Sequence, residues 1–383
     1  MARKKKKKKK QVFYDLLETY SDSFIKPECP YADKCGGCMF QMLPYNLQLE
    51  LKQTYLKELL HDITDVGPVH KANPFHYRNR MDYVCAFGKT GLRERGSHRF
   101  VVDIENCMLL QKKSNSIYTT LHPFIKEIEG YNYLKHEGYL RYVIFRQAFY
   151  TSEVMVNFVA ANSDVKMQEL LEKSAELADS VSYLVHDGMA DLSFGDITHV
   201  EKKGFITEKL EDVKFKITPN SFFQSNSEIA LIMYKKIRDL AKGKVLDLYS
   251  GIGSISLFVS SATEHVTAVE LNEESVFAAN ENKELNSIQN TEFICSDARP
   301  FIKEHEGEYT TLIMDPPRSG IHPKMIKYIN QGKFEQIIYM SCNPKTFKDD
   351  VVNLDNYKLI SFEPFDMFPQ TPHIETLALL KRK

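Results

Sequence analysis

The sequence contains no long hydrophobic segment, no tryptophan and no excess of either charge. None of its apolar runs approaches the ~18 residues that a membrane-spanning helix needs, so no membrane partner is expected. The stretch from Gln11 to Tyr20 is interrupted by Asp15 and Glu18, and it therefore lacks the apolar core of a secretory signal. A cytoplasmic protein is expected. For the absence of tryptophan we have no physical account.

The near-zero net charge conceals an uneven distribution along the chain. The 50 basic and 51 acidic residues almost cancel, but Arg3 and Lys4–Lys10 supply eight of the positive charges. The remaining 42 basic side chains face 51 acidic ones, so the body of the protein is acidic. A polybasic arm on an acidic body indicates salt-sensitive contact with phosphates, as in nucleic acid. A solvated tail without a partner explains the arm equally well.

The tetrapeptide Ser341-Cys342-Asn343-Pro344 closes a short apolar run, residues 337–340. The run predicts a buried strand that ends before the proline and places the thiol at the strand's carboxyl end. Ligands bind at that end of open α/β sheets, so the thiol is well placed to act as a nucleophile. Free cysteine is also among the residues most often buried for packing, so the tetrapeptide alone leaves both roles open.

A glycine pair and an acidic strand end predict a cofactor site in the same sheet. Gly251 and Gly253 follow one predicted strand, where they allow close backbone approach to a ligand. Glu270 ends the next strand and can hydrogen-bond both hydroxyls of a ribose. A dinucleotide site would need a third glycine where the chain has Ser256, whereas Asp247 is typical of S-adenosylmethionine (SAM) sites. We therefore favour SAM over NAD. The strands predicted here are residues 244–249 and 265–270, and an apolar strand within residues 311–318 that ends in an acid and two prolines.

Four motifs, taken in order, resemble the RNA uracil-5-methyltransferase family. They are residues 247–253 (Asp-Leu-Tyr-Ser-Gly-Ile-Gly), 315–318 (Asp-Pro-Pro-Arg), 341–344 (Ser-Cys-Asn-Pro) and 373–375 (His-Ile-Glu). The resemblance extends from residue 29 to the end of the chain. It implies an α/β fold whose C-terminal part is the doubly wound, Rossmann-like sheet of a class I SAM methyltransferase. Many members carry Cys-Gly where this chain has Ser-Gly, but that cysteine is not catalytic in the family.

The resemblance assigns the chemistry to two residues. Cys342 is expected to add as a thiolate to carbon 6 of uracil, which makes carbon 5 nucleophilic toward a methyl group. Glu375 is expected to be the general base that then removes the hydrogen from carbon 5. Its sequence position alone would suggest only a carboxylate on an edge strand. The side chains that the resemblance assigns to SAM are Gln224, Tyr249, Ser254, Glu270, Asp297 and Asp315. From sequence alone, Asp297 is equally well explained as a helix N-cap.

The loop at residues 315–318 distinguishes uracil from other target bases. RNA cytosine-5-methyltransferases usually carry a second cysteine there, and this loop has none. Amino-methyltransferases place an aromatic residue where this chain has Arg318, and they have no use for a nucleophilic thiol. Uracil in RNA is therefore the predicted substrate, and the base has to leave its stack. A catalytically silent RNA-binding protein of the same fold is the alternative, against which intact Cys342 and Glu375 argue.

Three cysteines near the N-terminus, Cys29, Cys35 and Cys38, have the spacing Cys-x5-Cys-x2-Cys, with two glycines inside the close pair. Backbone amides turned toward sulfur suit an iron–sulfur cluster, although three or four thiolates also fit zinc. Without a secretory signal, such thiols are better explained as metal ligands than as disulfides. The resemblance implies a [4Fe-4S] cluster with Cys107 as fourth ligand, whereas Cys85 lies in a predicted core strand.

The chain is long enough for two to three domains. We expect a basic tail and lead-in (1–28), an iron–sulfur segment (29–74), a central α+β RNA-binding domain (75–215) and a methyltransferase domain (216–383). The cluster and its Cys-Gly-Gly-Cys arrangement resemble the branch of the family that acts on 23S ribosomal RNA. Ribosomal RNA is therefore the expected substrate and transfer RNA the alternative. A monomer is expected.

Overall fold

The computed structural model describes residues 12–97 and 99–383, so the polybasic arm lies outside the described part of the chain. The chain divides into two compact units. Unit 1 combines three segments, Met1–Lys26, Met42–Ala72 and Glu228–Lys383, and unit 2 comprises Pro27–Gln41 and Asn73–Ser227. The four-part division of the chain expected from the sequence stays a prediction.

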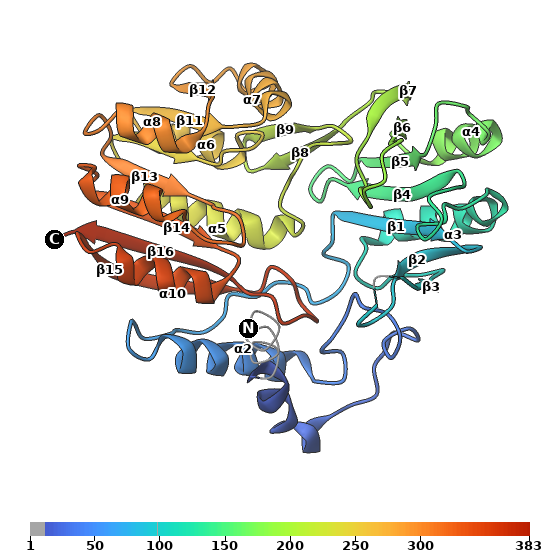
Figure 1. Cartoon of the computed structure of the whole chain (residues 1–383), viewed down its shortest axis with the longest axis horizontal. Helices are drawn as coiled ribbons and strands as arrows, with labels where there is room; N and C mark the ends of the chain where they lie inside the picture. The colour runs from blue at the N-terminus through green and yellow to red at the C-terminus, as the bar shows by residue number, and fades with distance from the viewer. Residues whose placement is uncertain (1–11, 98) are drawn as a thin grey trace. The chain divides into compact units, whose positions relative to one another are not determined.

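Unit 1 contains a seven-stranded sheet in the order β12-β11-β10-β13-β14-β16-β15 (Figure 1). The strands from β12 to β14 run parallel, whereas β16 pairs antiparallel with both β14 and β15. Helices alternate with the parallel strands, as a doubly wound sheet requires. The strands are β10 (Lys244–Leu248), β11 (His265–Glu270), β12 (Thr291–Cys295), β13 (Thr311–Met314), β14 (Gln336–Ser341), β15 (Tyr357–Phe365) and β16 (Glu375–Arg382). The helices are η1 (Ser21–Ser23), α2 (Tyr45–Leu60), α5 (Ser227–Leu240), α6 (Ser254–Val259), η2 (Ser260–Ala262), α7 (Glu273–Leu285), α8 (Ala298–Glu304), α9 (Pro323–Gln331) and α10 (Pro344–Asn353).

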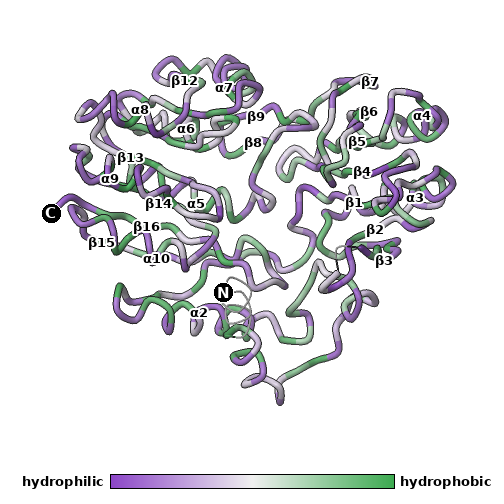
Figure 2. Tube along the Cα trace, in the orientation of Figure 1, coloured by the Kyte–Doolittle hydropathy of each residue, from purple (hydrophilic) through white to green (hydrophobic). Residues whose placement is uncertain are grey.

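The central strands of unit 1 are short apolar runs because both faces of the sheet are covered. All residues of β13 and β14 are buried, and hydrophobic residues follow one another along them (Figure 2). Such continuous runs are typical of parallel strands, whereas a half-exposed strand would alternate apolar and polar residues. The strand predicted at residues 265–270 coincides with β11. The α/β fold expected from the sequence is confirmed for this unit.

Unit 2 also contains a seven-stranded sheet, in the order β3-β2-β1-β4-β5-β6-β7. Every pair of neighbouring strands in this sheet is antiparallel except β5 and β6. These two strands run parallel and are connected through α4. Tyr118 of α3 and Leu171 of α4 belong to the same buried core as Phe145 of β4. The elements are β1 (Arg80–Ala86), β2 (Lys89–Arg93), β3 (Val101–Asp103), α3 (Lys112–Glu127), β4 (Leu140–Gln147), β5 (Val154–Ala160), α4 (Gln168–Leu177), β6 (Ser180–Val185), β7 (Asp196–Lys202) and a separate hairpin of β8 (Ile206–Leu210) and β9 (Val213–Ile217). Among the described residues of both units, no helix is long and apolar enough to span a membrane.

Candidate active site

The carboxyl ends of the parallel strands in unit 1 bring four predicted site residues to one edge of the sheet. Tyr249 follows β10, Glu270 ends β11, Asp315 follows β13 and Cys342 follows β14. The register pairs the end of β10 with the ends of both neighbours, so these residues lie side by side along the edge. This edge is where open α/β sheets bind their ligands.

The turn after β14 holds Cys342 half-buried rather than sealed in the core. The Ser341 hydroxyl accepts a hydrogen bond from the Asn343 N–H at 3.2 Å. The Asn343 side chain accepts from the Lys345 N–H, which caps the start of α10, and donates to the Arg318 carbonyl at 3.0 Å. The asparagine therefore fixes the cysteine turn to the Asp-Pro-Pro-Arg loop and to the following helix at once.

Glu375 is brought beside this turn by the antiparallel insertion of β16. It is the first residue of β16, and its neighbour Thr376 pairs with Ser341, the residue before Cys342. The Thr376 hydroxyl also donates to the Ser341 carbonyl at 3.1 Å. The Glu375 side chain is almost fully buried, at 6 % exposure. A thiol and a carboxylate therefore occupy adjacent strand ends.

Burial and neighbouring carboxylates suppress negative charge at this end of the sheet. Burial, with the Glu375 and Asp315 carboxylates, raises the pKa of the Cys342 thiol to about 11, while the Arg318 guanidinium and a backbone hydrogen bond oppose the shift. Burial and then Asp315 raise the pKa of Glu375 well above its ordinary value. Burial raises the pKa of Asp315 to about 6. Without a ligand, the thiol is therefore protonated at neutral pH while Asp315 is mostly ionised.

The Glu270 carboxylate is fixed by backbone donors on two sides. One oxygen accepts from the Gly251 N–H at 3.0 Å. The other accepts from the N–H groups of Leu271 and Asn272, at 2.8 and 2.9 Å. The glycine loop after β10 and the end of β11 are thereby held together, with the half-buried carboxylate between them.

The loop between β10 and α6 has a tightly constrained backbone. Tyr249 lies in the left-handed region at φ 67°, which non-glycine residues rarely adopt. Gly253 has φ 80°, and a Cβ atom there would lie 2.5 Å from the Phe293 ring. Ser254 begins α6, and its hydroxyl lies 3.0 Å from the Tyr234 hydroxyl. Only glycine fits position 253, because both the conformation and the space exclude a side chain.

Asp247 is a buried carboxyl group whose environment the sequence did not reveal. It is 1 % exposed, and its oxygen accepts a hydrogen bond from Ser256. Burial, with the Asp315 and Glu270 carboxylates, raises the pKa of Asp247 to about 7. Ser256, which stands where a dinucleotide motif would have its third glycine, is therefore the hydrogen-bond partner of the Asp247 carboxyl group.

Two further residues predicted to bind SAM lie in different settings. Asp297 caps α8 by accepting from the Arg299 N–H at 2.9 Å, and it also forms an ion pair with the Arg299 guanidinium. Gln224 belongs to unit 2, so its role in cofactor binding stays a prediction.

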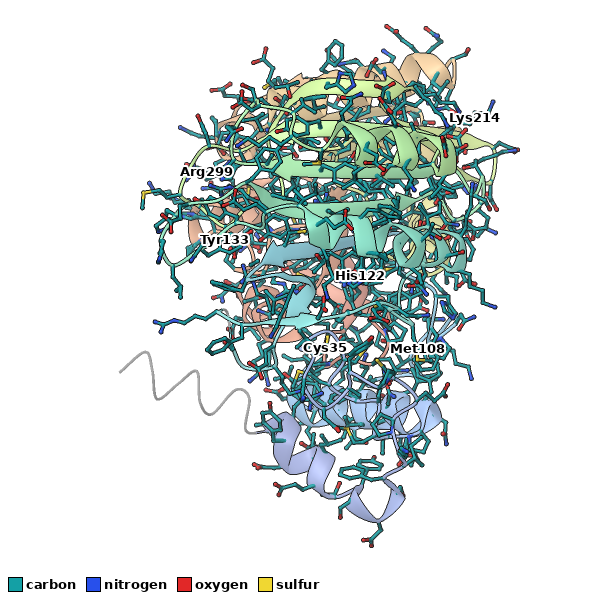
Figure 3. All side chains as sticks on the ribbon, turned by 90° about the vertical axis from the view of Figure 1, so that its right-hand side faces the viewer. Cys35, Met108, His122, Tyr133, Lys214 and Arg299 are labelled. Carbon is teal, nitrogen blue, oxygen red and sulfur yellow. The ribbon has the colours of Figure 1, made fainter. Side chains whose placement is uncertain are left out.

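The four cysteines expected to bind a cluster line one small pocket of unit 2. Cys29, Cys35, Cys38 and Cys107 share it with apolar residues such as Leu92. Figure 3 labels Cys35 and Met108, which also line this pocket. The alternative candidate, Cys85, is buried in β1 and is not among the lining residues.

Backbone amides and the Arg95 guanidinium surround the loop that carries these thiols. The Cys35 sulfur accepts from the Gly37 N–H at 3.3 Å, as a turned glycine amide allows. Arg95 binds the loop from outside, donating to the carbonyls of Ala32 and Cys38. Burial raises the pKa of Cys38 to about 12. Within residues 12–97 and 99–383, no group of three or more His, Cys, Asp or Glu has the geometry of a metal-ion site. The iron–sulfur expectation is therefore not shown.

The sheet order and the groups at its carboxyl edge define a class I methyltransferase fold. The chain belongs to the family described as tRNA (Uracil-5-)-methyltransferase, whose model matches residues 44–383.

Individual relatives are similar along most of their length. The chain is 37 % identical over 359 residues to a tRNA (uracil(54)-C(5))-methyltransferase of Pyrococcus furiosus, covering 92 % of this chain and 85 % of the relative. It is 35 % identical to an uncharacterized RNA methyltransferase of Clostridium acetobutylicum, covering 94 % and 84 %. The crystal structure of the Pyrococcus abyssi tRNA (uracil-54, C5)-methyltransferase with S-adenosyl-L-homocysteine superposes with a TM-score of 0.80 at 36 % identity, covering 90 % of this chain and 86 % of that one.

These relatives confirm the expected family of RNA uracil-5-methyltransferases. They give no support to the expectation of 23S ribosomal RNA as substrate, because the relatives with a named substrate act on transfer RNA. The tRNA alternative is the better supported of the two.

Proposed function

We propose that this protein transfers a methyl group from SAM to carbon 5 of a uridine in transfer RNA. The proposal depends on one observation, the half-buried Cys342 thiol beside Glu375 and Asp315 at the carboxyl edge of the unit 1 sheet. Family membership and the two Pyrococcus relatives supply the substrate class. The Arg318 guanidinium, which acts on both Cys342 and Glu375, adds a positive charge to the proposed site.

The thiolate of Cys342 adds to carbon 6 of the extruded uracil, and the ring electrons move to carbon 5 and oxygen 4. Bound SAM supplies the methyl group that carbon 5 takes up. The Glu375 carboxylate then removes the proton from carbon 5. The electrons of that C–H bond re-form the carbon 5–carbon 6 double bond, and the bond from sulfur to carbon 6 breaks. The products are 5-methyluridine, S-adenosylhomocysteine, the restored Cys342 thiolate and a protonated Glu375.

The charge pattern of the site favours this sequence of events. A thiol with a pKa of about 11 is almost fully protonated at neutral pH, so addition requires its proton to pass to solvent, which reaches the half-buried sulfur, and its negative charge to be stabilised. The Arg318 cation, which opposes the raised pKa of both Cys342 and Glu375, supplies that stabilisation. The carboxylates at this edge attract a cationic methyl donor into the same place.

The SAM site is assigned to the loop after β10 and the two adjoining strand ends. Glu270 would bind the ribose hydroxyls, because three backbone N–H groups fix its carboxylate and leave lone pairs for a ligand. Tyr249 and Ser254 flank the glycine loop, Asp315 lies toward the reacting end, and Asp297 would lie beside the adenine.

A methylation assay with three transcripts tests the substrate. Purified protein is incubated with methyl-labelled SAM and a tRNA carrying uridine at position 54, the same tRNA with cytidine there, and a 23S rRNA fragment. The position is taken from the names of the Pyrococcus relatives. We expect label in the first tRNA only. Label in the rRNA alone would restore the ribosomal substrate, and label in none would favour the silent RNA-binding protein.

We also propose that Cys29, Cys35, Cys38 and Cys107 hold a [4Fe-4S] cluster. Four thiols around one pocket form the all-cysteine donor set that such clusters use, and a turned glycine amide already points at one sulfur. The bound cluster would supply a rigid cross-link between distant parts of unit 2. The protein is purified anaerobically, and iron and acid-labile sulfide are measured against Cys107→Ser and, as control, Cys85→Ser. Loss of both elements in Cys107→Ser alone is expected; equal content in the two variants would reject this ligand set.

A further inference from the structure

Helix α2 buries two polar side chains that the proposed reaction does not use. Gln48 is 1 % exposed and Lys52 is fully buried, on the same helix as the buried Leu51, Leu56 and Leu60. Long polar side chains are almost never fully buried unless they are paired. Their partners therefore indicate what this part of the helix does.

Lys52 forms a buried ion pair with Asp366, which directly follows β15. Its ammonium lies 2.5 Å from one Asp366 oxygen, and neither side chain is exposed. The Tyr45 hydroxyl, from the first residue of α2, donates to the other Asp366 oxygen at 2.9 Å. Lys52 also donates to the Phe368 carbonyl at 3.3 Å. Two side chains of α2 thus fix both the carboxylate and the backbone of one short segment.

Gln48 binds the same segment at Gln370, four residues after Asp366. Its amide donates to the Gln370 side-chain oxygen at 2.8 Å, and its own oxygen accepts from the Gln370 N–H at 3.2 Å. Gln370 has a φ of 67°, a left-handed conformation that costs energy for a residue with a side chain. The reciprocal hydrogen bonds provide a reason for that conformation to persist.

The segment held in this way is residues 366–374, which connects β15 to β16, and β16 begins with Glu375. A buried ion pair is seldom more stabilising than apolar side chains of the same size, so stability alone is a poor explanation for it. Its best-supported effect is to fix one arrangement among several. All of these groups belong to unit 1.

We propose that Lys52, together with Gln48, is a positioning residue that fixes the 366–374 segment and thereby sets the Glu375 carboxylate against carbon 5 of the substrate. This inference rests on the proposed function. It predicts that loosening the segment impairs one step selectively. Thiolate addition and methyl uptake proceed, but removal of the carbon 5 proton slows, so the bond from Cys342 to carbon 6 is not broken. The methylated covalent adduct should therefore accumulate.

The test compares Lys52→Met with Lys57→Met, which replaces an exposed lysine of the same helix. Each protein receives SAM and a tRNA with ordinary uridine, and turnover, the KM for SAM and the denaturant-resistant protein–RNA complex are measured. For Lys52→Met we expect turnover about 10²-fold lower, as for a misplaced catalytic group, with the KM for SAM within about twofold. The covalent complex should accumulate as it does in Glu375→Gln. Lys57→Met should behave like the wild type.

Two further variants keep the test decisive if Lys52→Met folds poorly. Gln48→Leu removes the second anchor without leaving a buried charge, and Lys52→Met/Asp366→Leu replaces the ion pair by an apolar pair. Accumulated adduct in the well-folded variants supports the inference. Unchanged turnover, or a loss that follows the folded fraction without adduct, overturns it. A wild-type protein that methylates no RNA would instead overturn the proposed function.

Discussion

Asp247 provides a quantitative test of the electrostatics of the SAM site. Its carboxyl group is buried beside two other carboxylates, and its pKa is raised from 3.8 to about 7. A raised pKa means that the folded state holds the proton more tightly than the unfolded chain. The resulting stabilisation is complete below about pH 4 and is lost as the pH rises through 7. At 1.36 kcal/mol per pKa unit, the total loss is about 4 kcal/mol, of which about 3 kcal/mol falls between pH 5 and pH 8.

Asp247→Asn removes this ionisation while keeping an oxygen for the Ser256 hydroxyl. At pH 5 the variant should already be the more stable protein by about 1–2 kcal/mol, because Asp247 is neutral in the folded protein but ionised in the unfolded chain. At pH 8 this advantage should grow to about 4 kcal/mol, the full loss calculated for the wild type. Urea unfolding of both proteins at the two pH values, without SAM, measures the difference. Asp355→Asn, at an exposed aspartate, is the matched control and should show no such change.

A difference in stability that stays the same at pH 5 and pH 8 would refute this reasoning. It would mean that Asp247 ionises in the folded protein at little cost, so that the strand ends around it are well solvated. The raised pKa values of Asp315 and Glu375, which have the same cause, would then lose their basis too.

Three other substitutions test separate parts of the site. Glu375→Gln should lower turnover by about 10²–10⁴-fold, because a general base is lost, and gel analysis should show Cys342 still bonded to RNA. Rapid release of RNA from this variant would exclude Glu375 as the base. Glu270→Gln should raise the Kd for SAM by on the order of tenfold or more in calorimetry, since a charged hydrogen-bond acceptor is removed; an unchanged Kd would place the ribose elsewhere. Gly253→Ala should lower the Tm, because its Cβ meets the Phe293 ring at a positive φ. An unaltered Tm would show that the loop adjusts freely.

The strands that carry the site could be predicted because each is encoded locally. Residues 265–270 form one short apolar run, and the structure makes it β11. The same holds for the run before Cys342, since a proline marks its end and a buried parallel strand needs no alternation. Sequence-local signals thus give both the strand and the residue at its carboxyl end.

Contacts between distant segments could not be predicted in this way. Glu375 lies beside Cys342 only because β16 inserts antiparallel next to β14, and no local pattern specifies that register. Lys52 and Asp366 are 314 residues apart, and the lysine resembles any polar helical residue until its partner is known. The sequence offers one sign of the burial of Lys52, which is its place between leucines that form the buried face of α2. The choice between ribosomal and transfer RNA likewise depended on cysteine spacing, which says little about the RNA surface recognised.

The central claim is that the Cys342 sulfur bonds to carbon 6 of a uridine in tRNA. A tRNA containing 5-fluorouridine tests this claim directly. Its carbon 5 carries fluorine in place of the hydrogen that the base removes, so the bond from sulfur to carbon 6 cannot be broken again. With SAM present, the wild type and Cys295→Ala, a control at an exposed cysteine, should form a denaturant-resistant complex, and Cys342→Ala should form none. A complex of equal yield in Cys342→Ala, or none in the catalytically active wild type, would contradict the mechanism.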